Sequence, residues 1–352
     1  MDLKTLGWDR YSRSQKNIEN LSSKNLARVA VENRGSYLLY SEYGELEGII
    51  QGKFMRNAKD ETDYPKVGDW LEIEKLSGEN KAVIKSILPR RTKISRKRAG
   101  EDVAEQIIAT NVDIAFIVQG LDGDFNISRL ERYIAMAKEG GCQPIILLNK
   151  CDLNDGTQKL VEAKKILGDI EIFLISAMTQ EGVEDVKKII ADGISVVFVG
   201  SSGAGKSTLV NAILGSEKQK TAEIRSDDSR GRHTTTKREL IVLPQGGILI
   251  DTPGMRELGL WVSEEALGET FQDIEVFSKL CKFSDCNHVS DKGCAVIQAL
   301  QDGKISQQRY ETFSKLRNTL DPMKAKKDAN DLQAQKRGRR RLIKRPEFSK
   351  DK

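Results

Sequence analysis

Short apolar runs recur along the middle of the chain, and most of them end at a polar residue or a glycine. These runs are Asp113–Val118, Ile145–Leu148, Ile172–Ile175, Val196–Val199 and Ile248–Ile250. Stretches with helical spacing, such as Ser128–Glu139, alternate with them from about Ile107 to Leu260. Continuous apolar runs are typical of parallel strands buried on both faces. The sequence therefore predicts an α/β domain with helices on both sides of its sheet, which would bind ligands at the carboxyl ends of the strands.

A glycine-rich loop follows the run Val196–Val199, and the helical pattern of Leu209–Leu214 follows the loop. The loop consists of Gly200, Ser201, Ser202, Gly203, Ala204, Gly205, Lys206, Ser207 and Thr208. Glycines allow backbone N–H groups to curl around phosphates, and the helix N-terminus adds its dipole. Lys206 is expected to contact the β- and γ-phosphates in binding and catalysis, and Ser207 to bind Mg²⁺. This loop indicates a nucleoside triphosphate without specifying the base.

The base is indicated by Asn149, Lys150, Cys151 and Asp152, which follow another predicted strand. A carboxylate such as Asp152 accepts two hydrogen bonds from the ring N–H and the exocyclic amine of guanine. Adenine presents an acceptor where the first donor is needed, so the buried charge would be left unpaired. Ser176 and Ala177 end the next predicted strand and would close the guanine pocket with a backbone N–H. We therefore expect Asn149, Lys150, Asp152, Ser176 and Ala177 to bind GTP.

A third motif, Asp251-Thr-Pro-Gly254, follows the run Ile248–Ile250. Asp251 is expected to support Mg²⁺, and the Gly254 N–H to sense the γ-phosphate. In an ordinary GTPase the phosphate loop comes first and the guanine motif comes last. Here the guanine motif precedes the phosphate loop. The order predicts a circularly permuted GTPase domain.

A polar stretch, Gly231–Thr236, separates the phosphate loop from Asp251 and contains three consecutive threonines. A mobile loop that offers a threonine hydroxyl to Mg²⁺ is what a GTP-dependent switch requires, and Thr235 is our first choice. Many GTPases place a water-orienting glutamine after the Asp-Thr-Pro-Gly motif, but Met255 stands there. His233 is a candidate for the missing catalytic role; the sequence equally allows a histidine that only binds loop backbone. Slow intrinsic hydrolysis that depends on a partner is expected.

Three cysteines and a histidine gather within a short polar segment, at Cys281, Cys286, His288 and Cys294. Three thiolates and one imidazole form a closed tetrahedral set for zinc, with no open position for catalysis. The sequence therefore predicts one structural Zn²⁺, which would stabilise a small domain that is otherwise marginal.

The N-terminal region alternates short β-type runs with turn residues. The runs are Leu26–Val31, Ser36–Tyr40, Glu47–Gln51, Asp69–Glu74 and Lys81–Ser86. About five strands in some seventy residues suit a small closed barrel of the oligonucleotide-binding type, although the alternation equally allows an SH3-like barrel. Contact with RNA and a purely supporting role are both open at this point.

The positive charge of the chain is concentrated at its C-terminal end. The net charge is +5, whereas residues 323–352 carry twelve Lys and Arg against four Asp and Glu. A second basic run, Pro89–Arg98, contains no acid. Two such runs in a nucleotide-binding protein favour a polyanionic partner, and RNA is the obvious one.

Other features of the composition bear on location. The odd number of cysteines, five, and the absence of a secretory signal argue against a disulfide framework. No apolar run has the length of a membrane span. We expect a cytoplasmic protein with no membrane partner, and a monomer.

In its combination of motifs, the chain resembles the bacterial ribosome small-subunit-dependent GTPase A family (RsgA, also called YjeQ). The resemblance includes Val67-Gly-Asp69, Pro89-Arg-Arg91, the permuted motifs, Gly231–Thr236 and the zinc cluster followed by Ala295. It implies an oligonucleotide-binding barrel, a permuted GTPase core and a zinc domain that dock on the 30S ribosomal subunit. It also implies a late assembly factor that hydrolyses GTP on the subunit and helps to release maturation factors, with His233 assisting hydrolysis.

We therefore expect a multidomain α/β protein. Its parts are an OB-like barrel with a basic linker at residues 1–98, a circularly permuted P-loop GTPase domain at 99–262, and a helical zinc-binding domain with a basic tail at 263–352. The main hypothesis is a Mg²⁺-dependent GTPase acting as an RNA-bound switch, with GTP and GDP as ligands and the 30S subunit and its 16S rRNA as partners. The alternative is an RNA-binding assembly chaperone in which GTP binding regulates affinity and hydrolysis is secondary.

Overall fold

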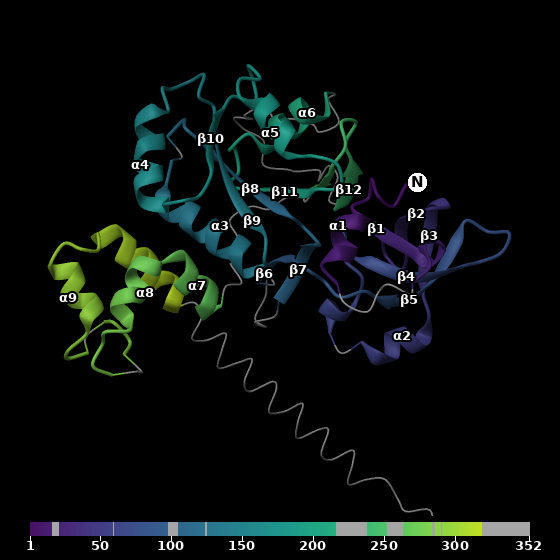
Figure 1. Ribbon diagram of the computed structural model, residues 1–352, viewed down its shortest axis with the longest axis horizontal. Coiled ribbons are helices and arrows are strands. Elements are labelled where there is room, and N and C mark those ends of the chain that lie inside the picture. The colour runs from purple at the N-terminus through teal and green to yellow at the C-terminus, as the bar shows by residue number, and fades with distance from the viewer. Residues whose placement is uncertain are drawn as a thin grey trace, which may run out of the picture. The chain divides into compact units, whose positions relative to one another are not determined.

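The computed structural model describes residues 1–15, 21–58, 60–97, 105–123, 125–215, 238–251, 263–283, 286–289 and 291–318 (Figure 1). The chain forms two compact units. Residues 1–98 and 104–261 make up the first, and the second consists of residues 262–352 together with 99–103. The expected division of the first unit at residue 98 stays a prediction.

The N-terminal part of the first unit is a closed five-stranded barrel. Its strands are β1 (Leu26–Glu32), β2 (Tyr37–Ser41), β3 (Gly44–Ile50), β4 (Trp70–Lys75) and β5 (Lys81–Ile87). They pair in the order β1-β2-β3-β5-β4, and β4 pairs with β1 to close the barrel. All five expected strands are confirmed. Helix α2 (Gly52–Asn57) lies between β3 and β4 in the chain, and the strand order is that of an oligonucleotide-binding barrel.

The rest of the first unit is built on the predicted parallel sheet. Its strands are β8 (Ile114–Gly120), β9 (Gln143–Asn149), β10 (Ile172–Ile175), β11 (Ser195–Val199), β12 (Glu239–Val242) and β13 (Ile248–Asp251). They lie in the order β10-β9-β8-β11-β13-β12, and all are parallel except β12. The phosphate-loop strand β11 is thus central, although it is fourth in the chain.

Helices cover both faces of this sheet, as predicted (Figure 1). They are α3 (Ile127–Glu139), α4 (Thr157–Leu167), α5 (Val183–Ile189) and α6 (Lys206–Leu214). Apolar residues of α5 and α6 share one buried cluster with Phe116 of β8 and Phe198 of β11, whose rings stack. On the other side, α3 contacts β8 and β9. Burial by helices on both faces explains why these strands are continuously apolar in sequence.

The barrel and the parallel sheet are joined at one edge. Val31 of β1 pairs with Glu239 of β12, so the eleven strands form one continuous hydrogen-bonded sheet. A separate antiparallel pair, β6 (Lys93–Lys97) and β7 (Glu105–Thr110), links the two parts along the chain. The sequence did not indicate this pair.

A fully buried arginine crosses the junction between barrel and core. Arg28 of β1 donates hydrogen bonds to Leu6 O (2.6 Å), Gly68 O (3.2 Å), Asn111 O (3.1 Å) and Ser195 Oγ (2.9 Å). Burial lowers the pKa of Arg28 to about 10, which still leaves it charged at neutral pH. Removing any one acceptor would leave part of a buried cation unpaired, so the junction has a single well-defined arrangement.

Asp113, immediately before β8, extends this network. It accepts a hydrogen bond from Ser195 N (2.8 Å) and ion pairs with Arg10 (2.6 Å) and Arg91. The carboxylate therefore ties the N-terminal segment and the basic run to β11, the strand that leads into the phosphate loop.

The segment before the barrel, whose role the sequence left open, forms part of the junction. Helix α1 (Trp8–Arg13) places Tyr11 against Trp70, and the Tyr11 hydroxyl donates to Pro89 O (2.7 Å). Gly7 has φ +84°, and a Cβ there would lie 2.7 Å from Gly193 O. The N-terminal residues thus pack on both the barrel and the loop that precedes β11.

Three cations of the basic run after the barrel form ion pairs within the described part of the protein. Arg90 pairs with buried Asp69 (2.8 Å), Arg91 with Asp113, and Lys93 with Glu105 (2.6 Å). These cations hold the junction, so the run offers less charge to RNA than its sequence suggests.

The second unit is mainly helical, as expected. Its helices include α7 (Glu264–Thr270), α8 (Gln272–Ser278) and α9 (Ala295–Gln301), and residues 307–318 are helical as well. Phe271 and Phe313 meet edge to face in its small core. Arg309 stacks on Phe271 and pairs with Asp273 (2.5 Å). Among the helices described, none is long and apolar enough to cross a membrane.

Candidate nucleotide site and metal centre

The sheet order brings together motifs that are far apart in the sequence. Asn149 at the end of β9 is in register with Gly120 of β8 and Ile175 of β10. Val199, the last residue of β11, is in register with Ile117 of β8. The phosphate loop and the guanine motif therefore leave the same edge of the sheet, as predicted from their positions after apolar strands.

Asn149 connects three loops at this edge. Its side chain is buried, donates from Nδ2 to Ala204 O (2.9 Å) and accepts at Oδ1 from Ala177 N (2.9 Å). The first contact fixes the phosphate loop, and the second fixes the loop after β10. Asn149 therefore sets the distance between the predicted phosphate and base subsites.

The phosphate loop has the backbone that its glycines allow. Gly200 has φ +149° and Gly205 has φ +91°; a Cβ at Gly200 would collide with Val118 O, and one at Gly205 with the Asn149 amide. Lys206, the first residue of α6, folds back to donate to Gly200 O (2.8 Å) and Ser201 O (2.5 Å). The lysine ammonium is thus held inside the loop, where a phosphate would lie.

Asp152, the predicted guanine reader, is oriented by a buried neighbour. Ser176 is fully buried, and its hydroxyl donates to Asp152 Oδ1 (2.5 Å) while accepting from Thr179 N (3.1 Å). The sequence pointed to Ser176 as a pocket residue but not to this supporting contact. A single orientation of the carboxylate favours a ligand with matching donors.

Cys151, between Lys150 and Asp152, is a neutral thiol rather than a reactive thiolate. Burial, with the Glu181 carboxylate nearby, raises its pKa, so the thiol stays protonated at neutral pH. It fills the variable position of the motif, as the sequence indicated.

The structure describes only some of the residues that are predicted to act around Mg²⁺ and the γ-phosphate. Asp251 ends β13, which lies beside β11, and Ser207 lies in the first turn of α6. His233, Thr235, Gly254 and Met255 lie outside the described residues. Their expected roles stay predictions.

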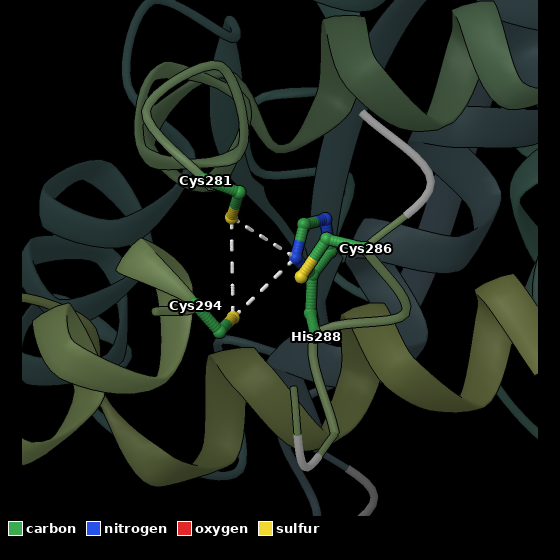
Figure 2. Close-up of side chains that lie close together, drawn as sticks. All are labelled: Cys281, Cys286, His288 and Cys294. Carbon is green, nitrogen blue, oxygen red and sulfur yellow. Dashed lines mark hydrogen bonds between the residues drawn. The ribbon is translucent and has the colours of Figure 1, made fainter. Parts of the chain in front are cut away.

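The cysteines and histidine predicted to bind zinc do come together in the second unit (Figure 2). The ligand atoms of Cys281, Cys286, His288 and Cys294 all lie within 4.8 Å of one another. Cys286, His288 and Cys294 are buried, and Cys281 is partly exposed. The four ligands come from the segment between α8 and α9.

The distances among three of the ligands, Cys281, His288 and Cys294, fit a tetrahedral zinc ion. Zn–S and Zn–N bonds of about 2.3 and 2.0 Å require ligand separations of about 3.8 Å for S···S and about 3.5 Å for S···N. Cys281 Sγ lies 4.0 Å from Cys294 Sγ and 3.5 Å from His288 Nδ1, and Cys294 Sγ lies 3.6 Å from His288 Nδ1. The donor set and its spacing therefore suit a closed metal site.

Residues around the cluster orient its ligands. His288 Nε2 hydrogen-bonds Ser278 Oγ (3.1 Å), which leaves Nδ1 facing the sulfurs. Burial, together with Arg317, lowers the pKa of His288, so its ring is neutral as a metal ligand must be. Tyr310 donates to His288 O (2.7 Å) and Arg317 to Cys286 O (3.0 Å). These three supporting contacts come from helices flanking the cluster and were not predicted.

Comparisons with known proteins show which family this sequence resembles. The sequence model of the family described as RsgA GTPase matches residues 87–261. The chain is 40% identical to the small ribosomal subunit biogenesis GTPase RsgA of Opitutus terrae, over 90% of this chain and 89% of that protein. It is 44% identical to the protein of the same name from Methanosarcina acetivorans, over 77% and 73%.

Solved structures show the same fold. The crystal structure of YjeQ from Thermotoga maritima has a TM-score of 0.63 and 26% identity, covering 84% of this chain and 99% of that chain. YloQ, described as a circularly permuted GTPase, has a TM-score of 0.59 and 24% identity, covering 86% and 96%. The predicted permutation of the fold is confirmed.

Proposed function

This chain belongs to the RsgA GTPase family, and from that membership we propose that it hydrolyses GTP as an assembly factor of the small ribosomal subunit. The relatives named above carry that role in their names. The observation that supports the nucleotide assignment best is the position of Asn149, which bonds the phosphate loop and the loop after β10 together. This contact brings together two motif residues that lie 55 residues apart in sequence.

Each part of the nucleotide has a proposed contact. Asp152, held by Ser176, reads the guanine ring N–H and amine, and Ala177 closes the pocket. The amides of Gly200–Thr208 and the Lys206 ammonium bind the phosphates. Ser207, with Thr235, holds Mg²⁺, and Asp251 supports the ion from the neighbouring strand. We assign the activation of water to His233.

The metal centre is proposed to hold one structural Zn²⁺. Four protein ligands and buried surroundings leave no open position, so the ion would supply folding energy rather than chemistry. With Ser278 behind His288, the zinc stabilises the segment between α8 and α9.

The proposed partners are the 30S subunit and its 16S rRNA. The oligonucleotide-binding barrel supports this assignment, as does the strongly basic sequence of residues 323–352. Those C-terminal residues lie outside the described part of the chain. Docking on the subunit would order the switch residues and so stimulate turnover.

The central experiment compares GTP and ATP turnover with and without purified 30S subunits. Hydrolysis of GTP is expected to rise roughly tenfold or more with subunits, because a partner completes a site that lacks the usual glutamine. ATP turnover is expected to stay at background under both conditions. Equal GTP turnover with and without subunits would contradict the proposed dependence on the partner.

A substitution at Gly205 tests the geometry around Asn149. Gly205→Ala places a methyl group against the Asn149 amide at a left-handed φ, so we expect GDP affinity to fall roughly tenfold or more. Calorimetric titration with GDP measures the change.

The matched control is Gly215→Ala at the other end of α6. Gly215 also has a left-handed φ, +65°, but has open space around its Cβ position. This variant should lose some stability and keep its GDP affinity. Equal GDP affinities for the two variants would argue against the role given to Asn149.

A further inference from the structure

The loop between β8 and α3 lies directly against the guanine motif. Leu121 N donates to Asn149 O (2.9 Å). Leu121 O accepts from Asn154 Nδ2 (3.3 Å) and from Lys159 Nζ (2.9 Å). Three contacts on one residue hold this loop in a fixed position beside Asn149–Asp152.

An ion pair joins the same loop to the middle of the motif. Asp122 Oδ2 accepts from Lys150 Nζ, and both side chains are half-buried. Lys150 has φ +71°, so its backbone turns out of line with β9 at this point. The pair therefore connects a loop outside the recognised motifs to a residue that stands between Asn149 and Asp152.

Gly120 makes this pairing possible. It is in register with Asn149, and a Cβ there would collide with the Asp122 carboxylate and lie 3.6 Å from Lys150 Cδ. The lysine stem and the carboxylate thus meet over the bare backbone of Gly120. A side chain at residue 120 would separate them.

We propose that Asp122 is a positioning residue of the nucleotide site, which holds the Lys150 stem alongside the guanine base read by Asp152. This inference rests on the proposed guanine-nucleotide site. A lysine that is free in solution loses rotamer freedom when it orders against a ligand. Pairing Lys150 with Asp122 in advance removes part of that loss, so the nucleotide binds more tightly.

The test measures GDP affinity for four full-length proteins: the wild type, Asp122→Ala, Lys150→Met and the double variant. Asp122→Ala is expected to weaken GDP binding about 3- to 10-fold, because the pair is only partly exposed. Lys150→Met keeps the stem and removes the charge. In that background, Asp122→Ala should cause no further loss, and the difference between wild type and Asp122→Ala should shrink at high salt.

Asp185→Ala is the matched control. Asp185 forms an exposed pair with Lys188 of the same helix, α5 (2.8 Å), so GDP affinity should be unchanged. Asp122→Asn keeps the size of the side chain and tests the charge alone if the alanine variant unfolds at a lower temperature.

The outcomes separate this inference from the proposed function. A wild type that binds no GDP refutes the nucleotide site itself. A wild type that binds GDP while Asp122→Ala and Asp122→Asn bind equally well, or better, overturns the positioning role. An equal loss in the wild-type and Lys150→Met backgrounds also overturns it, since Asp122 would then act through the loop and not through Lys150.

Discussion

Replacing Asp152 by asparagine is expected to lower the affinity for GTP roughly 100-fold. Hydrogen bonds to a charged group contribute about 1.5–3 kcal/mol each, and guanine offers Asp152 two donors. The amide of asparagine presents an N–H₂ group toward the exocyclic amine, so one attraction becomes a conflict between donors. Titration of GTP and GDP into the full-length variant measures the loss.

Binding of xanthosine triphosphate by the same variant provides a second test of the base assignment. Xanthine carries a carbonyl oxygen in place of the guanine amine, so an asparagine at residue 152 can donate to it and still accept from the ring N–H. The variant should therefore bind the xanthine nucleotide better than GTP, while its zinc content stays that of the wild type. A variant that retains its preference for GTP would refute the assignment of Asp152 to the base.

The second large effect is expected at the metal centre. Cys294→Ser removes one of the four ligands, and structural zinc sites contribute roughly 10–16 kcal/mol of apparent binding free energy. This exceeds or matches the whole stability of a typical domain, about 5–15 kcal/mol. The variant should lose most of its zinc, and residues 263–318 should become sensitive to protease. Zinc analysis and limited proteolysis measure both changes.

The first unit provides an internal reference for the same variant. Its barrel and parallel sheet have their own buried core, so GDP affinity should remain close to that of the wild type. Cys151→Ser is the control for loss of a thiol outside the cluster, and it should keep a full complement of zinc. Normal zinc content in Cys294→Ser would mean that the cluster is not the metal site.

Strong local patterns made much of the fold predictable. The apolar runs predicted the parallel strands because each is buried by helices on both sides. Helix α1 has only six residues, and its position depends on distant partners such as Trp70 and Asp113. Strand β6 is rich in Lys and Arg, so its sequence did not suggest a strand. The strand tolerates these charges because residues of other elements, Glu105 among them, pair with them.

The candidate site also has a part that local sequence predicts and a part that depends on distant residues. Residues such as Lys206 and Asp152 belong to short motifs at strand ends, so the roles proposed for them follow from local sequence. The contacts that orient them come from far along the chain. Ser176 reaches Asp152 across 24 residues, Asp122 reaches Lys150 across 28, and Ser278 reaches His288 from a neighbouring helix. A serine or aspartate in a turn carries no sign of such a partner until the topology is known.

The position of β13 between β11 and β12 has a consequence for synthesis of the chain. The barrel is complete once Ile87 has left the ribosomal exit tunnel, whereas β8, β9, β10 and β11 then emerge with an open apolar edge. That edge persists until Ile248–Asp251 inserts, beside β11 on one side and β12 on the other. The same insertion brings Asp251 to the nucleotide site. A nascent chain therefore closes its sheet and places Asp251, the proposed support of Mg²⁺, in a single late step.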